Sequence, residues 1–158
     1  MHTMFLTHKR IQYTVRAIVE LAKYYGQGPR KISEIAEAQF IPLKFLEVIL
    51  NQMKGSGWVT SKRGFYGGYT LTRNPAEITV GDIVRYMQGG GETTDSSDCF
   101  VCESRDQCPF SGECVFSAMW NRVTEAAFAI YDETSIQDLL ESHLTKLGQI
   151  QRGLGSVT

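Results

Sequence analysis

Residues 31–73 decide the fold of this chain, and they read KISEIAEAQFIPLKFLEVILNQMKGSGWVTSKRGFYGGYTLTR. The apolar spacing predicts two short helices joined by a tight turn at Phe40, the first capped by Ser33 and the second with Pro42 in its first turn. Their inner faces are predicted to bury Ile35, Ala36, Leu43, Leu46, Ile49, Leu50 and Met53.

A hairpin is predicted to follow the helix pair. Alternating residues at 58–61 and 69–72 predict two strands, and the tip between them, 62–68, contains three glycines. Glycine lets a backbone turn sharply and approach another molecule closely. A helix pair followed by a hairpin is the order of a winged helix-turn-helix, so we predict a mostly α fold of this class that binds DNA.

The outer face of the second helix is the candidate base-reading surface, because the start of such a helix enters the major groove. This face carries Lys44, Phe45, Glu47, Val48, Asn51 and Gln52. Lys44 suits guanine or phosphate, whereas Phe45 and Val48 suit a thymine methyl group. The hairpin tip adds candidates for phosphate or minor-groove contact: Lys62, Arg63, Gly64 and Tyr66. The alternative for Lys62 and Arg63 is that they are only solvated charges of a turn.

Charge is distributed unevenly along the chain, although the net charge of its 158 residues is only −1. Residues 1–88 hold 12 Lys and Arg against 6 Asp and Glu, whereas residues 89–158 hold 4 against 11. This asymmetry indicates that only the front part meets phosphate, since the back part would repel it.

Further helices are predicted before and after residues 31–73. Apolar periodicity predicts a first helix over about residues 7–25, and Thr79 is expected to cap a helix at 80–88. Small polar residues and glycines at 89–98 predict a flexible linker. The expected organisation is therefore a DNA-binding domain, a linker with a cysteine loop, and dimerisation helices, at residues 1–88, 89–113 and 114–150.

A long helix is predicted from Cys114 to about residue 132, followed by another from Ser135. The first of these two helices has an apolar stripe that consists of Phe116, Met119, Val123, Ala126, Ala127 and Ile130. The stripe could be buried within the chain or shared between two copies. The length of the helix favours a seam between the two subunits of a homodimer.

Four cysteines lie close together with the spacing Cys99-x2-Cys102-x5-Cys108-x5-Cys114. Without a secretion signal, this clustering indicates metal or redox chemistry rather than a structural disulfide framework. Soft thiolates select an iron–sulfur cluster or zinc, and the x5 spacings favour the cluster. A thiol or disulfide switch is the third possibility, although the acidic residues around the cysteines would not lower a thiol pKa.

Other classes of protein have less support. No apolar run is long enough to span a membrane, and residues 1–10 do not resemble a signal peptide, so a cytoplasmic protein is expected. The nucleotide-binding loops and the zinc-protease motif are missing from the sequence, so an enzyme is not expected.

The sequence resembles the IscR/NsrR family of bacterial iron–sulfur transcription regulators over about residues 4–140. The resemblance is carried by Cys102-x5-Cys108-x5-Cys114 with Trp120 six residues on, and by four segments at 31–36, 45–54, 61–71 and 78–83. It implies a homodimer paired through the long helix, binding to an approximately palindromic double-stranded operator. It also implies cluster ligation by the three cysteines of this motif, with Arg63 in the minor groove. The base-reading residues that it implies are Lys44, Phe45, Glu47 and Val48.

Two positions depart from the family pattern. Ser117 stands where IscR-like members have a ligand histidine, and Gln12 stands where nitric-oxide-sensing members have an aspartate. Cys99 is the expected fourth ligand, with His8 as a weaker substitute. We therefore expect a 4Fe–4S cluster, with 2Fe–2S possible, that senses iron, redox state or nitric oxide. The alternative is a regulator of the same fold that carries zinc or no metal and senses a small molecule or thiol oxidation.

Overall fold

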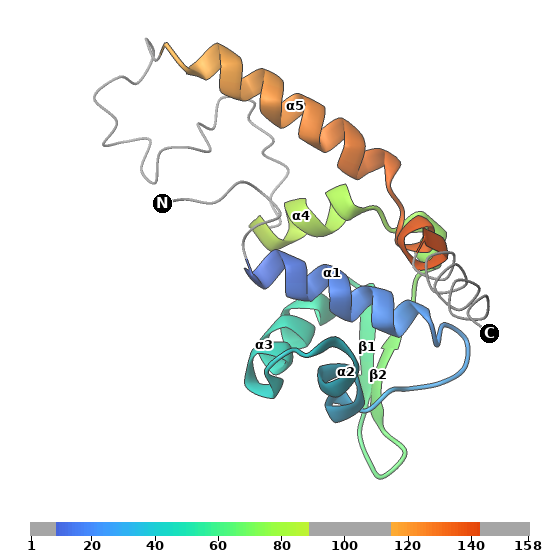
Figure 1. Ribbon diagram of the computed structural model, residues 1–158. Coiled ribbons are helices and arrows are strands. Elements are labelled where there is room, and N and C mark those ends of the chain that lie inside the picture. The colour runs from blue at the N-terminus through green and yellow to red at the C-terminus, as the bar shows by residue number, and fades with distance from the viewer. Residues whose placement is uncertain (1–8, 89–114, 143–158) are drawn as a thin grey trace, which may run out of the picture.

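The computed structural model describes residues 9–88 and 115–142 (Figure 1). The fold is mostly helical with a two-stranded wing, as predicted. Residues 136–142 are helical as well. The elements run in the order α1 (Lys9–Ala22), α2 (Ile32–Gln39), α3 (Leu43–Lys54), β1 (Val59–Lys62), β2 (Gly68–Leu71), a 3-10 turn η2 (Pro75–Glu77), α4 (Val80–Gln88) and α5 (Ser117–Glu133).

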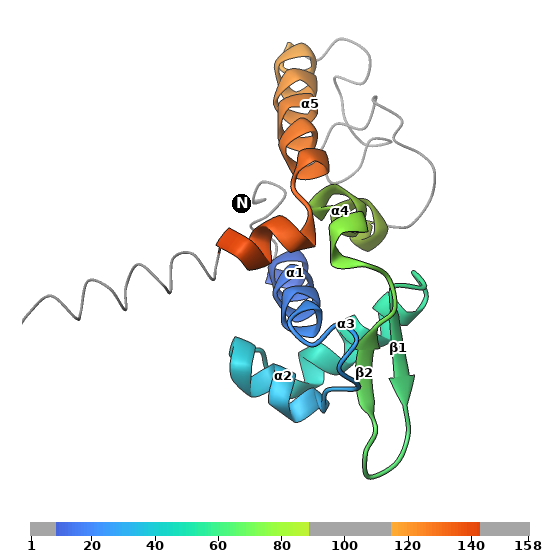
Figure 2. The same ribbon diagram turned by 90° about the vertical axis from the view of Figure 1, so that its right-hand side faces the viewer.

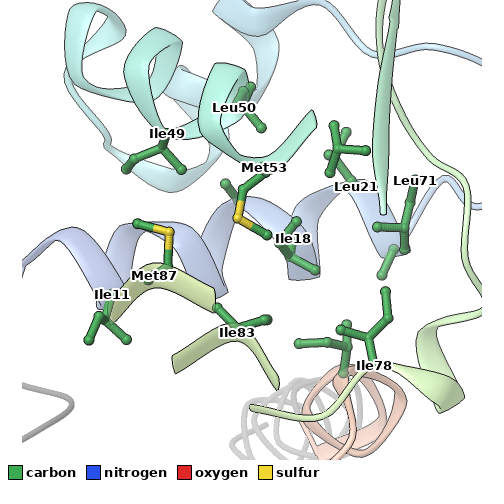
Figure 3. Close-up of a cluster of buried hydrophobic side chains, with 14 of the residues drawn as sticks. Ile11, Ile18, Leu21, Ile49, Leu50, Met53, Leu71, Ile78, Ile83 and Met87 are labelled. Carbon is green, nitrogen blue, oxygen red and sulfur yellow. The ribbon is translucent and has the colours of Figure 1, made fainter. Parts of the chain in front are cut away.

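Helix α1 occupies the middle of the molecule. Helices α2 and α3 and the hairpin lie on one side of it, whereas α4 and α5 lie on the other (Figures 1 and 2). Side chains from α1, α3, α4 and β2 meet in one apolar cluster around the middle of α1 (Figure 3). Each large apolar side chain buried in this way contributes about 1.5–3 kcal/mol to stability, so the cluster fixes α3 and the wing relative to each other.

Helix α2 begins two residues earlier than predicted, because Lys31 and not Ser33 is its N-cap. The backbone of Arg30 pairs with that of Tyr69 in β2, through an N–H donated in each direction at 2.9 and 2.8 Å. This pairing fixes the chain at residue 30. The carboxylate of Glu34 then accepts the Lys31 amide at 3.1 Å, so the helix starts directly after the bridge.

The turn between α2 and α3 is built on Phe40, which has a left-handed backbone with a φ of 50°. The amide of Ile41 donates to the carbonyl of Ala36 at 3.0 Å and closes the end of α2. Leu43 is half exposed, so its predicted inward position is wrong. It is the first residue of α3, and the buried face of this helix starts only one turn later, at Leu46.

The wing is an antiparallel hairpin with the register Val59↔Leu71 to Lys62↔Gly68. Its first strand begins and ends one residue later than predicted, and its second strand one residue earlier. Val59 and Leu71 are buried against the helices, whereas the rest of β1 is exposed. A Cβ atom at Gly68 would lie 2.3 Å from the carbonyl oxygen of Arg30. Only glycine therefore permits the start of β2 to lie so close to the backbone of residue 30.

The predicted cap of α4 is confirmed, since the amide of Asp82 donates to the Thr79 hydroxyl at 3.0 Å. The amide of Thr79 in turn donates to the Asp82 carboxylate at 3.0 Å, which completes a capping box.

The chain after α5 returns to the residues that precede and begin α4. The amide of Val80 donates to the carbonyl of Thr134, and that of Ile136 to the carbonyl of Ile78, both at 2.9 Å. The side chain of Ile136 is completely buried in the common core. Residues 134–136 are therefore joined to the core formed by residues 9–88, although they follow α5 in sequence.

Candidate nucleic-acid interface

The outer face of α3 is exposed where the sequence predicts base reading. Lys44, Phe45, Glu47 and Val48 are all exposed, while the opposite face of the helix is buried. Phe45 is held from one side by Tyr13 of α1, with ring centroids 5.6 Å apart at an edge-to-face angle of 82°. The first two turns of α3 therefore present a mixed surface of one cation, one carboxylate and three apolar side chains, since Leu43 is exposed as well.

The second half of α3 is occupied by contacts within the chain. Arg10 donates to the side-chain oxygen of Gln52, and the hydroxyl of Tyr86 donates to the Gln52 carbonyl at 2.8 Å. Asn51 is exposed. The structure thus leaves the start of α3 more accessible than its end, as expected for a helix that enters the groove by its N-terminal turns.

A buried carboxylate that the sequence analysis missed fixes the helix pair on α1. Glu20 is only 2% exposed, and its carboxylate accepts from Lys23 Nζ and from Gln39 Nε2, both at 2.7 Å. Arg16 donates to the backbone carbonyl of Gln39. A buried charge is tolerated only when it is paired and hydrogen-bonded, so this network holds the end of α2 in a single position. On a helical projection Glu20 lies opposite Ile11 and Ile18, so apolar periodicity in α1 gives no signal of its burial, which depends on the packing of α2.

The tip of the wing, residues 63–67, lies on the same side of α1 as α3, far from α5 (Figures 1 and 2). Lys62, Arg63, Gly64 and Tyr66 are all exposed. Gly64 has a φ of 109°, which only glycine adopts without strain. The structure adds Phe65, an exposed aromatic residue that the sequence analysis passed over because it considered only charges, glycines and Tyr66 there.

The cations at the start of α3 and at the wing tip have no acidic partner in the described part of the chain. Within residues 9–88 and 115–142, Lys44, Lys62 and Arg63 form no ion pair. Arg30 is different, because it pairs with Glu34 at 3.2 Å and stacks over the ring of Tyr24 at 4.0 Å. The unpaired cations keep their charge available for phosphate, whereas Arg30 has a structural role.

The four predicted metal ligands, Cys99, Cys102, Cys108 and Cys114, lie outside the described residues, as does His8. Among the residues that the structure describes, no group of three His, Cys, Asp or Glu side chains could hold a metal ion. By donor chemistry the four thiolates fit an iron–sulfur cluster or zinc, as soft sulfur ligands do in general. Gln12 is exposed on α1.

Helix α5 carries exposed apolar residues along its length. Ile130 is 64% exposed and Met119 is about half exposed, and Phe116, the N-cap residue before the helix, is 62% exposed. Only the C-terminal part of the helix packs on the core, through Phe128 and Tyr131. The described helices include none that is both long enough and apolar enough to cross a membrane.

An ion pair fastens this C-terminal part of α5 to α4. The guanidinium of Arg85 donates twice to the carboxylate of Asp132, at 2.7 and 2.6 Å, and lies 4.7 Å from the ring centroid of Phe128. The hydrogen bonds to Asp132 raise the pKa of Arg85 above its usual value. A Cβ atom at Gly81 would lie 1.9 Å from the Asp132 carboxylate, so glycine at this position leaves room for the pair. We call this pair, together with the backbone bridge at residues 134–136, the α4–α5 joint.

A helix pair with an exposed outer face, a basic wing beside it and a long appended helix together define a winged-helix DNA-binding transcription regulator. The sequence pattern of the Rrf2 family, described as an iron-dependent transcriptional regulator, matches residues 7–142. The chain belongs to the Rrf2 family and is not an enzyme.

Two named relatives illustrate the range of the family. The chain is 34% identical over 128 residues to the HTH-type transcriptional regulator CymR of Bacillus subtilis, covering 81% of this chain and 84% of that protein. It is 28% identical over 139 residues to the HTH-type transcriptional regulator IscR of Photorhabdus laumondii, covering 88% and 80%.

Solved structures agree with this assignment. The structure of T. potens IscR matches with a TM-score of 0.68 at 28% identity, covering 87% of each chain. The structure of B. subtilis CymR, described as the global cysteine regulator, matches with a TM-score of 0.67 at 31% identity, covering 90% of this chain and 98% of that one.

Proposed function

We propose that this Rrf2-family regulator acts as a homodimer whose affinity for an approximately palindromic operator is switched by an iron–sulfur cluster. Cys99, Cys102, Cys108 and Cys114 are the proposed ligands. The single observation that carries the DNA-binding part is the exposed start of α3 beside a wing with unpaired cations.

The proposed DNA contacts follow from the chemistry of the exposed side chains. Lys44, Phe45, Glu47 and Val48 would face the base edges in the major groove. Lys62, Arg63, Gly64 and Tyr66 would meet the minor groove and its phosphates, where a narrow glycine backbone and cations are favoured.

The homodimer is supported by α5. Its exposed apolar residues would lose contact with water if a second copy of the helix packed along them, and this burial favours association. Since α5 is fastened to α4 at its C-terminal end by the α4–α5 joint, pairing of two such helices would set the distance between the two α3 helices. A dimeric helix-turn-helix protein of this kind binds two half-sites with a fixed spacing.

The proposed switch acts through the segment that joins α4 to α5. A bound cluster would join the four thiolates and tie residues 99–114 together, and its binding energy would act as local folding energy. The ordering of this segment would then bias the direction in which α5 leaves it. Arg85 and Asp132 would pass that direction on to α4 and the core beneath α3.

The proposal is tested by preparing the full chain without oxygen. We expect visible absorbance, bound iron and sulfide in place of zinc, a dimer in sedimentation, and selection of a palindromic sequence from a pool of random duplexes. A monomer, or a protein that binds all duplexes equally, would contradict the proposed sequence-specific binding by a dimer. A colourless protein without iron would contradict the proposed iron–sulfur switch.

The second candidate is a regulator of the same fold without a cluster, and the similarity to CymR favours it. The structure of that relative is described as the global cysteine regulator, and the relative is the more similar of the two named above at 34% identity. In this case the cysteines would act as thiols, or a small molecule would bind. The two candidates differ in iron content, since the second predicts a colourless protein that still selects its operator.

A further inference from the structure

Phe65 and Tyr66 form an aromatic pair at the apex of the wing, which we call the aromatic tip. Phe65 is 79% exposed and Tyr66 is 83% exposed. Their ring centroids lie 5.1 Å apart at an angle of 86°, so each ring packs mainly on the other. Two large rings held in water at the end of a hairpin are unfavourable unless they meet a partner, which makes the tip a candidate interaction surface.

The backbone places these two rings at the apex. The amide of Gly67 donates to the carbonyl of Gly64 at 2.9 Å, which closes a four-residue turn with Phe65 and Tyr66 as its central residues. A Cβ atom at Gly67 would lie 2.2 Å from the carbonyl oxygen of Lys62. The backbones of the two arms therefore lie close together behind the rings, and the glycines at 64, 67 and 68 carry no side chains, so the tip is narrow enough to enter a groove.

The charge around the aromatic tip identifies the kind of partner. Lys62 and Arg63 precede the turn, and the Nζ atom of Lys31 lies 5.2 Å from the ring centroid of Phe65. Residues 61–70 contain no acidic side chain. An apolar pair surrounded by cations complements the minor groove of a duplex, where phosphates flank the stacked bases and sugars.

We propose that Phe65 is an apolar wedge that enters the minor groove beside each operator half-site and partly unstacks one base step, so that the protein bends its DNA. Phe65 has no polar group and suits the stack, whereas the Tyr66 ring would lie on a sugar with its hydroxyl on a phosphate. Lys31 would neutralise a phosphate next to the wedge. This inference rests on the proposed DNA binding and adds deformation of the DNA to it.

A wedge has a consequence for sequence preference. Pyrimidine–purine steps such as TA unstack more easily than other steps, so the protein would prefer them at the position below the tip, without a hydrogen bond to any base there. The preferred step would lie outside the bases that α3 reads.

The experiment uses the full chain and the duplex that it selects from a random pool, labelled at both ends for energy transfer. A copy with 2-aminopurine at the step below the tip reports unstacking. We expect the wild type to raise 2-aminopurine fluorescence and shorten the end-to-end distance. Phe65→Ala should lose both signals and bind about a hundredfold more weakly, in line with a loss of about tenfold for each of the two stacking contacts of the proposed dimer. Phe65→Leu is the matched control and should keep most of the bend, since leucine is also an effective wedge.

The outcomes separate this inference from the proposed function. If the wild type selects no duplex, the proposed DNA binding fails and the wedge fails with it. If the wild type selects a duplex while Phe65→Ala keeps its bend, its fluorescence and its affinity, only the wedge is overturned. Circular dichroism melting of both variants controls for folding, and no change is expected because the ring contacts no buried residue of the core cluster.

Discussion

The winged domain (residues 9–88) and helix α5 use the same kinds of residue in opposite ways. In the winged domain the apolar side chains meet around α1, and Met53 is completely buried. On α5 only Phe128 and Tyr131 pack against this core, whereas Met119 is 49% exposed and Ile130 is 64% exposed. The difference indicates that the winged domain is stabilised by a core that Ile136 completes, whereas most of α5 has an apolar surface suited to a second subunit.

The two methionines give the largest expected difference between these regions. Met53→Ala should lower the free energy of unfolding by about 3 kcal/mol, because it removes buried contacts and leaves a cavity. Met119→Ala should change the unfolding of the winged domain by less than about 0.5 kcal/mol and instead weaken dimerisation. Urea denaturation at one protein concentration and sedimentation equilibrium measure the two effects. Equal losses of stability would contradict the division of roles.

The wing charges extend the comparison to DNA. Replacing both Lys62 and Arg63 by Gln removes these two cations from each of the two wings of the proposed dimer, so the slope of log K against log salt should fall by about 4, roughly one for each lost phosphate contact. Arg73→Gln is a suitable control, since Arg73 pairs with Glu77 at 3.5 Å and follows the hairpin rather than its tip. Fluorescence anisotropy with a labelled duplex at several salt concentrations provides the slopes. An unchanged slope in the double variant would show that both residues are only solvated turn charges.

The turn at Phe40 tests whether the winged domain carries local strain. Phe40 has a φ of 50° and is 87% exposed, so its ring adds little packing to offset a left-handed backbone. Phe40→Gly should raise the free energy of unfolding by about 1 kcal/mol. Phe40→Ala keeps the backbone restriction and should give no such gain. A loss of stability in the glycine variant would instead assign the ring a packing role.

The α4–α5 joint connects the two regions and gives the smallest expected effect on stability. The Arg85 and Asp132 side chains are each more than a third exposed, so a double-mutant cycle with Arg85→Gln and Asp132→Asn should give a coupling free energy of about 0.5 kcal/mol. Urea denaturation of the four proteins measures it. A coupling near zero would leave the backbone bridge at residues 134–136 and the packing of Phe128 and Tyr131 as the connections between the two regions.

Most of the local structure could be predicted from the sequence, because it depends on neighbouring residues. The spacing of Leu46, Ile49 and Leu50 predicted the buried face of α3, and Thr79 predicted the cap of α4. The candidate DNA-binding surface could also be proposed from local patterns. Lys44 and Lys62 lie on the outer sides of elements whose inner, apolar sides the sequence had already indicated.

Most of the errors and omissions come from contacts between distant residues, although the wrong placement of Leu43 has a local cause, its position at the first residue of α3. The start of α2 was misplaced because it depends on the bridge between Arg30 and Tyr69, which periodicity does not reveal. The burial of Ile136 depends on pairing with Ile78, 58 residues earlier in the chain. The buried Glu20 was missed because its partner Gln39 belongs to another helix.

The most direct test of the central claim compares operator affinity in two proteins prepared without oxygen, the wild type and Cys108→Ala. Both should be dimers, and only the wild type should contain iron and sulfide. The proposed switch predicts that their dissociation constants for the selected operator differ by about tenfold or more. Equal dissociation constants, with the cluster present in one protein and lost from the other, would contradict it.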